Sequence, residues 1–199
     1  LRGMLEANGQ IVGTYTSPYI ELFNERISVN GDPLSDAEIL RLANIVYPLT
    51  KELEKTILGE PSEFEIITMM MLLYFGEGHA DVVLIEVGIG GTYDSTNVIT
   101  PIVSVITTIG LDHMNLLGDT LSEIAGNKAG IIKATVPVVI GKIGKEAMTV
   151  IENKAAEQDS TLLKYNQDFF VTKWQTLPTW GEQFVFEDDF IRLSPIQIE

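Results

Sequence analysis

Two apolar, strand-like runs that each end at glycine constrain the fold of this chain more than any other feature. The first is Asp81–Val87, followed by Gly88-Ile89-Gly90-Gly91, and the second is Ile102–Ile109, followed by Gly110. Runs rich in Val, Leu and Ile are typical of parallel strands that are buried on both faces. Such strands need helices to cover them, so the two runs predict an α/β protein.

The rest of the first 160 residues alternates between expected helices and expected strands. Ser35 and Ser62 each precede a glutamate by three residues, which is the spacing of a capping box at the start of a helix. Pro48 is expected to kink or interrupt the first helix, because proline has no N–H to donate. The pattern predicts helices at 35–58, 62–77, 120–133 and 145–158, and strands at 11–16, 25–29 and 136–140. This order favours a mainly parallel sheet that is flanked by helices.

The last part of the chain has a different character. Short apolar runs occur at 169–171, 184–186 and 191–193, and turn-forming or polar residues separate them, as at 177–181. This pattern predicts an antiparallel meander appended to one edge of a sheet. We therefore divide the chain into an α/β core, residues 1–160, and a β meander, residues 161–199.

Composition excludes several classes of function. The 199 residues hold 13 Lys and Arg against 28 Asp and Glu, a formal net charge of −15, and contain no cysteine. The acidic balance argues against non-specific binding to nucleic acid or to an anionic membrane. The lack of cysteine excludes disulfides, a thiolate nucleophile and cysteine-ligated metal sites. No run reaches the roughly 20 apolar residues of a membrane-spanning helix, and we expect a cytoplasmic protein.

Glu86 is the first candidate site residue. A carboxylate within an apolar strand is costly to bury unpaired, so we expect a cation or a hydrogen-bond donor beside it. A metal ion and an ordinary lysine or arginine partner fit this expectation equally. The glycines that follow let a ligand approach the backbone closely, although they do not form the G-x-G-x-x-G pattern of dinucleotide-binding proteins.

His113 and Lys128 are two further candidates. His113 lies just beyond the end of an expected strand, where α/β proteins bind ligands, although a hydrogen-bonded structural role is the alternative. Lys128 lies seven residues after Leu121 and four after Ile124, and so on the apolar stripe of its helix. Such a lysine either extends its amine to water or has a depressed pKa. A neutral amine there is nucleophilic, as carbamylation by CO₂ requires.

Four blocks of sequence, in this order, resemble the folylpolyglutamate synthase and dihydrofolate synthase family of the Mur ligase superfamily. The first two are Tyr15-Thr16-Ser17-Pro18 with Phe23-Asn24-Glu25-Arg26-Ile27, and Glu86-Val87-Gly88-Ile89-Gly90-Gly91 with Asp94-Ser95-Thr96-Asn97. The other two are Gly110-Leu111-Asp112-His113 with Leu117-Gly118, and Lys128-Ala129-Gly130-Ile131-Ile132-Lys133. The chain departs from the family at Tyr19, commonly a histidine. It also departs at Thr92-Tyr93-Asp94-Ser95-Thr96-Asn97, where the family commonly has Arg-Leu-Asp-Ala-Thr-Asn.

The resemblance implies an ATP-dependent, ADP-forming ligase that joins L-glutamate to a folate carboxylate through an acyl phosphate. The implied partners are ATP, a folate (tetrahydrofolate or dihydropteroate) and L-glutamate, with no nucleic acid or membrane, and the full-length protein is expected to be a monomer. Two Mg²⁺ sites are implied. Ser17 and Glu86 would ligate one ion, and Glu86, His113 and a carbamylated Lys128 would surround the other and act in catalysis.

The resemblance also implies residues around the folate. Asp94, Ser62 and Phe64 are expected to contact its pterin end, and Asn97 and Asp112 are expected to support the site. The family's phosphate-binding Gly-x-x-Gly-Lys-Ser loop is not in these 199 residues, nor is its glutamate-binding C-terminal domain. Leu1 reads as the tail of a helix, so we expect an incomplete ATP-binding domain that is inactive alone.

Two alternatives to this function stay open. One is a Mur-type ligase that adds an amino acid to a cell-wall precursor, and the other is an inactive, truncated binding module.

Overall fold

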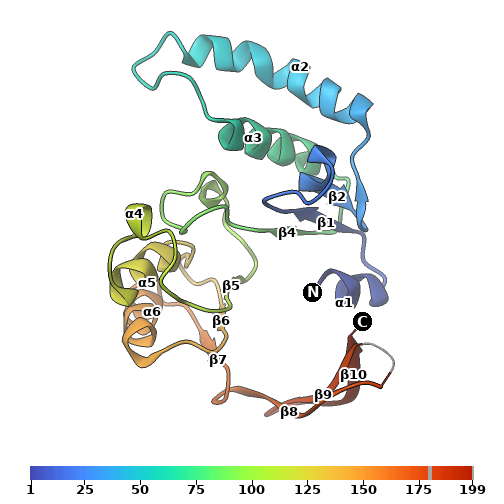
Figure 1. The fold of residues 1–199 in the computed structure, drawn as a ribbon, viewed down its shortest axis with the longest axis vertical. Helices are drawn as coiled ribbons and strands as arrows, with labels where there is room; N and C mark the ends of the chain where they lie inside the picture. Colours follow the sequence, from blue (N-terminus) through green and yellow to red (C-terminus); the bar gives the residue numbers. More distant parts are fainter. Residues whose placement is uncertain (179–180, 199) are drawn as a thin grey trace. The chain divides into compact units, whose positions relative to one another are not determined.

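A computed structural model describes residues 1–178 and 181–198 (Figure 1). The chain divides into two compact units. The first unit consists of Leu1–Ile89 and Tyr93–Val98, and the second consists of Gly90–Thr92 and Ile99–Glu199. The glycine-containing segment after Glu86 therefore contributes residues to both units.

The first unit is built on a four-stranded sheet in the order β3-β2-β1-β4. Strands β1 and β4 pair in parallel, whereas β2 pairs antiparallel with both β1 and β3. The elements in chain order are α1 (Arg2–Ala7), β1 (Val12–Tyr15), η1 (Phe23–Arg26), β2 (Ile27–Val29), β3 (Asp32–Pro33), α2 (Asp36–Leu53), α3 (Glu63–Gly76), β4 (Val82–Ile85) and η2 (Ser95–Val98).

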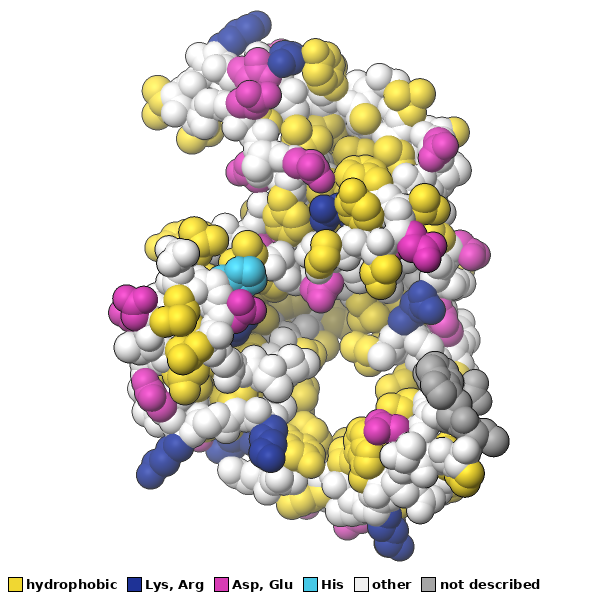
Figure 2. All heavy atoms as spheres, in the orientation of Figure 1, with side chains coloured by type: hydrophobic (Ala, Val, Ile, Leu, Met, Phe, Trp, Pro, Cys, Tyr) yellow, Lys and Arg dark blue, Asp and Glu magenta, His cyan; other side chains and the backbone are white. Residues whose placement is uncertain are grey.

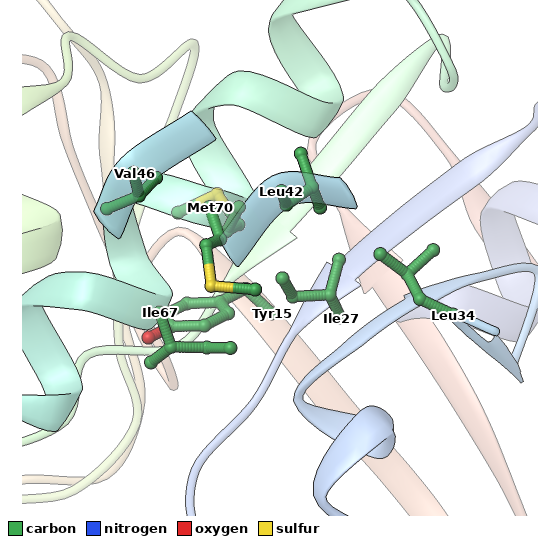
Figure 3. Packing of buried hydrophobic residues seen from close by; sticks show 8 residues of the cluster. Tyr15, Ile27, Leu34, Leu42, Val46, Ile67 and Met70 are labelled. Carbon is green, nitrogen blue, oxygen red and sulfur yellow. The ribbon is translucent and has the colours of Figure 1, made fainter. Parts of the chain in front are cut away.

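The core of the first unit lies between the sheet and the helices α2 and α3 (Figure 3). Alternate residues of a strand face opposite sides, so Tyr15 points into this core while Thr14 and Thr16 point to the other face of the sheet. The buried cluster is Tyr15, Ile27, Leu34, Leu42, Val46, Ile67, Met70 and Met71. The Tyr15 hydroxyl hydrogen-bonds with the Thr68 hydroxyl at 2.9 Å, so the phenol is not left unpaired when it is buried.

Both predicted helix starts in the first unit are confirmed. The hydroxyl oxygens of Ser35 and Ser62 accept hydrogen bonds from the amides three residues later, Glu38 and Glu65. At Ser62 the Glu65 side chain also accepts from the Ser62 amide, which completes a capping box. Pro48 does not interrupt α2, which continues to Leu53.

The second unit contains a fully parallel sheet in the order β5-β6-β7. Helices α5 and α6 pack against one another beside it (Figure 1). The elements are β5 (Ser104–Ile106), α4 (Met114–Leu117), α5 (Leu121–Ala129), β6 (Val138–Ile140), α6 (Lys145–Glu157) and β7 (Leu162–Lys164). A mainly parallel sheet with flanking helices is therefore confirmed, although α5 ends four residues before the predicted end of its helix.

The last strands form a separate antiparallel sheet in the order β10-β9-β8. They are β8 (Phe169–Thr176), β9 (Glu182–Asp188) and β10 (Arg192–Ile198), so the β-rich C-terminal part is confirmed. Two details differ from the prediction. Residues 162–164 are the third strand of the parallel sheet, and the meander forms its own sheet instead of extending an existing edge. Thr179 and Trp180, in the predicted turn, lie outside the described residues.

No helix in residues 1–178 or 181–198 has both the length and the apolar character needed to cross a bilayer. On the face drawn in Figure 2, acidic side chains are scattered across the surface instead of gathering in one patch.

Candidate functional site

Ser17 and Glu86 come together where two neighbouring parallel strands end. Ser17 follows β1 and Glu86 follows β4, and the backbone N–H of Ser17 donates to Oε2 of Glu86 at 2.9 Å. Glu86 is exposed and lies just after β4 instead of within it. Its carboxylate is therefore not buried, and the free-energy cost of burial from which we expected a cation or a donor does not arise. The expected hydrogen-bond donor is present. Among the described residues, neither Oε1 of Glu86 nor Oγ of Ser17 has a hydrogen-bond partner.

Glu25 holds the loop that follows Ser17. Its carboxylate accepts hydrogen bonds from the amides of Ile20 at 2.9 Å, Leu22 at 3.0 Å and Glu21 at 3.4 Å. The amides of Ile20 and Leu22 stabilise the ionised carboxylate and hold the pKa of Glu25 below its ordinary value. A single side chain thus fixes the path of the chain immediately after the candidate ligand Ser17.

Asp94 organises the part of the glycine segment that lies in the first unit. Its Oδ2 accepts from the Ile89 amide at 2.9 Å, and its Oδ1 accepts from both the amide and the hydroxyl of Thr96. The backbone carbonyl of Asp94 accepts from the Asn97 amide at 2.9 Å. Both carboxylate oxygens therefore already have protein partners, a structural role that the sequence did not reveal.

Phe64 and Ser62 lie at the start of α3. The Phe64 ring is 5.9 Å from the ring of Tyr15, and a Cβ at Gly88 would come within 2.6 Å of its Cζ atom. Glycine at position 88 is thus what allows the aromatic ring to lie against the segment after Glu86. The Ser62 hydroxyl donates to Glu65 Oε2 at 2.7 Å, and the hydrogen bond lowers the pKa of Glu65.

His113 and Asp112 belong to the second unit. His113 has a φ of 48°, in the left-handed region, and is the N-cap residue of α4. The Asp112 carboxylate accepts from the His113 amide at 2.8 Å, and its other oxygen lies 3.7 Å from Nε2 of the imidazole. Both side chains are about half exposed or more, at 49% for His113 and 77% for Asp112. Strand β5 ends at Ile106, so His113 does not lie just beyond the strand as expected but seven residues further along, at the start of α4. Its imidazole is accessible and can hold a ligand.

Lys128 lies in the last turn of α5 and is partly buried. The expected apolar stripe is present, because Ile124, Ala125 and Ala129 are buried on the same helix. Within the described part of the chain, no hydrogen bond or ion pair holds the Lys128 amine.

The residues that surround the C-terminal turn of α5 were missed by sequence reasoning. Thr92 donates both its amide and its hydroxyl to the backbone carbonyl of Asn127, at 2.9 Å and 3.0 Å. The Asn127 side chain donates to the Leu117 carbonyl at 3.1 Å. No sequence signal marks these contacts, because a threonine in a loop and an asparagine in a helix are usually solvated.

The structure does not gather a metal site from protein side chains alone. In residues 1–178 and 181–198, no group of three or more His, Asp or Glu side chains could hold a metal ion. Ser17, Glu86, Asp94, Ser62 and Phe64 lie in the first unit, whereas Asp112, His113 and Lys128 lie in the second. The predicted ligand sets therefore stay predictions.

A cavity of about 340 Å³ lies on the face of the first sheet that is opposite to the core. It holds none of the predicted site residues, and it is lined by Arg2, Thr14, Thr16, Glu25, Ser28, Gly31 and Pro33. Its polar groups already have partners. The hydroxyls of Thr14 and Ser28 pair with each other, Arg2 pairs with Glu6 at 3.4 Å, and Glu25 holds the loop amides.

Known proteins resemble this chain over almost all of its length. The dihydrofolate synthase/folylpolyglutamate synthase of Bacillus subtilis is 47% identical over 190 residues, which is 95% of this chain and 44% of the relative. The folylpolyglutamate synthase of Lacticaseibacillus casei is 44% identical over 196 residues, covering 98% and 46%. No protein-family model matches the sequence.

A solved structure supports the same assignment. A folylpolyglutamate synthase in complex with AMPPCP and folate aligns over 99% of this chain and 48% of its own, at 43% identity and a TM-score of 0.92. The chain thus spans about half the length of the relatives it matches. By both sequence and fold, the chain belongs to the folylpolyglutamate synthase and dihydrofolate synthase family.

Proposed function

We propose that the protein carrying these residues is an ATP-dependent ligase that adds L-glutamate to a folate. One observation carries this proposal: 99% of the chain superimposes on a folylpolyglutamate synthase whose solved complex holds an ATP analogue and folate. The contact between Ser17 and Glu86 supports it, because two residues of the matching blocks meet at the strand ends where α/β proteins bind ligands. A cytoplasmic location, action as a monomer and L-glutamate as the amino acid belong to the same proposal.

In the proposed reaction, the γ-phosphoryl group of ATP transfers to a carboxylate oxygen of the folate, and ADP leaves. The amino group of glutamate then attacks the acyl carbon, phosphate leaves, and the amine loses a proton. Such chemistry depends on positioning the reactants and on neutralising the charge of the phosphates. The chain contributes positioning through the Ser17 loop and the segment after Glu86, which Glu25 and Asp94 hold in place.

The oxygens of Ser17 and Glu86 fit a hard cation. Mg²⁺ is usually held by one or two carboxylates together with waters and substrate phosphates, and does not need a complete protein cage. Among the residues that the structure describes, Oε1 of Glu86 and Oγ of Ser17 have no hydrogen-bond partner, and they lie on adjacent segments. Mg²⁺ would supply charge neutralisation for the phosphates there. His113 would add a neutral nitrogen, and a carbamylated Lys128 would add an anionic oxygen, at the second proposed site.

The folate is proposed to lie near the start of α3 and the Asp94 loop. Phe64 offers an aromatic ring beside Gly88, and an aromatic face suits a flat heterocycle. The carboxylate of Asp94 and the hydroxyl of Ser62 already have protein partners, so their contribution would come mainly through the loop and the helix start that they fix. Asn97 and Asp112 are proposed as supporting residues.

The experiment is an assay of the full-length protein with ATP, L-glutamate and either tetrahydrofolate or dihydropteroate. The proposal predicts ADP formation that requires both co-substrates, and a folate product heavier by one glutamyl residue. A parallel reaction with a UDP-muramoyl peptide tests the cell-wall alternative. ADP formation with that peptide and none with a folate would overturn the proposal.

We also propose that the 199-residue chain alone does not turn over, because its sequence contains no Gly-x-x-Gly-Lys-Ser loop to hold the ATP phosphates. Isothermal titration of the chain with Mg-ATP tests this. We expect no measurable binding, and a sub-millimolar dissociation constant would contradict the proposal.

A further inference from the structure

Three segments of the second unit meet at the C-terminal turn of α5, which we call the α5 junction. They are Gly90–Thr92, the end of α4 at Leu117, and Asn127–Gly130. The backbones approach closely: a Cβ at Gly91 would lie 2.7 Å from the Asn127 carbonyl oxygen and 2.9 Å from that of Lys128. A Cβ at Gly130 would lie 2.4 Å from the Cα of Thr92. Only glycine fits at either position.

Asn127 connects all three segments of the junction. Its carbonyl oxygen accepts the amide of Thr92 at 2.9 Å and the hydroxyl of Thr92 at 3.0 Å. Carbonyls in the last turn of a helix lack the usual i+4 donor. The Asn127 carbonyl accepts from the Gly130 amide at 3.2 Å, and Thr92 adds two donors from another segment. The side-chain Nδ2 of Asn127 donates to the Leu117 carbonyl at 3.1 Å. The amide must be oriented in this way, because a carbonyl oxygen can only accept.

The hydrogen bond from Asn127 to the Leu117 carbonyl acts on the short helix that begins at His113. Helix α4 has only four residues, and its N-cap is His113, whose carbonyl accepts from the amides of Leu116 at 2.8 Å and Leu117 at 3.0 Å. A single turn of helix has little stability of its own. The bond from Asn127 therefore orders the turn that sets the backbone of His113, and Asn127 is also the residue immediately before Lys128.

We propose that Asn127 is a positioning residue that sets the placement of His113 relative to Lys128. This inference rests on the proposed function, in which both residues surround a metal site. Asn127 does not touch the substrate; it acts through the Leu117 carbonyl and through the Thr92 contact that holds the end of α5.

The test compares two variants of the full-length protein. Asn127→Asp keeps the size of the side chain but removes the donor and places a carboxylate against the Leu117 carbonyl. Ser122→Ala is the matched control, because Ser122 lies on the same helix and its hydroxyl bonds to Glu146 at 2.7 Å, outside the junction. For both variants, kcat and KM for folate are measured with ATP and glutamate, and amide hydrogen exchange is followed over residues 113–118.

For Asn127→Asp we expect a kcat that is at least about tenfold lower, with KM for folate within threefold of the wild type. The amides of Leu117 and Gly118 should exchange at least about tenfold faster. Ser122→Ala should leave kcat, KM for folate and the exchange of these two amides unchanged. An Asn127→Asp variant with kcat near that of an active wild type, or with unchanged exchange at Leu117, would overturn the inference. An inactive wild type would instead contradict the proposed function, so the two failures are distinguishable.

Discussion

The backbone amide of Ser17 donates a hydrogen bond to the Glu86 carboxylate at 2.9 Å, although 69 residues separate them in the sequence. The contact exists because β1 and β4 are parallel neighbours, with Tyr15 opposite Ile85, so that the chain leaves both strands at the same edge. Two residues that the sequence marked separately are thereby brought into contact.

Replacing Glu86 by glutamine should abolish most of the activity of the full-length protein. The variant keeps an oxygen that can accept from Ser17 but loses the charge that a hard cation requires. Loss of about 3 kcal/mol of transition-state stabilisation corresponds to a fall in kcat of about 100-fold. The steady-state rate of ADP formation measures this fall in kcat. Glu21→Gln removes an equal charge from an exposed residue and should stay within about twofold; equal activity of both variants would refute the role of Glu86.

Replacing Glu25 by glutamine should loosen the loop after Ser17. One amide oxygen cannot replace a carboxylate that accepts three backbone N–H groups. We expect the amides of Ile20 and Leu22 to exchange at least about tenfold faster, as followed by hydrogen exchange and mass spectrometry. Protection that is unchanged in this variant would show that other contacts hold the loop.

Acid should weaken the connection between α2 and α3. Arg41, through bonds of 2.7 Å and 2.9 Å, and then His79, hold the pKa of Glu77 below its ordinary value of 4.5. Because the folded-state pKa is the lower one, the stabilisation is present above about pH 4.5 and is lost as the pH falls through the folded-state value. The free energy of unfolding in urea, measured between about pH 7 and about pH 3, should decline less steeply in Glu77→Gln than in the wild type. Parallel pH profiles would contradict this account.

Replacing Ser62 by alanine should destabilise the start of α3. The variant loses the oxygen that accepts from the Glu65 amide and one of the two donors to the Glu65 carboxylate, and it keeps the donor amide of residue 62. A lost N-cap costs about 1 kcal/mol, which urea denaturation resolves. Ser62→Thr keeps an acceptor oxygen and should recover most of the loss. An alanine variant as stable as the wild type would show that the cap contributes nothing.

The parts of the fold that depend on local chemistry could be predicted from the sequence. Serine three residues before glutamate locates the starts of α2 and α3, and an apolar run that stops at glycine locates β4. These signals are local, because capping and strand termination use only neighbouring residues. The parallel pairing of β7 with β6 could not be predicted, since the polar residues around Leu162–Lys164 resemble those of the meander that follows.

The candidate site shows the same limit. Ser17, Glu86, His113 and Lys128 could be proposed from their blocks, but the exposure of Glu86 and the occupied carboxylate of Asp94 could not. Both depend on where the chain turns after a strand. Asn127 and Thr92 were missed because their hydrogen bonds join segments 35 residues apart in the sequence.

The most direct test of the account is mass spectrometry of the folate product after the full-length protein has reacted with ATP, L-glutamate and a folate. We expect a folate that carries one additional glutamyl residue, formed together with ADP, and we expect the Glu86→Gln variant to form it about 100-fold more slowly. An unmodified folate after complete reaction time, with a correctly folded wild-type protein, would contradict it.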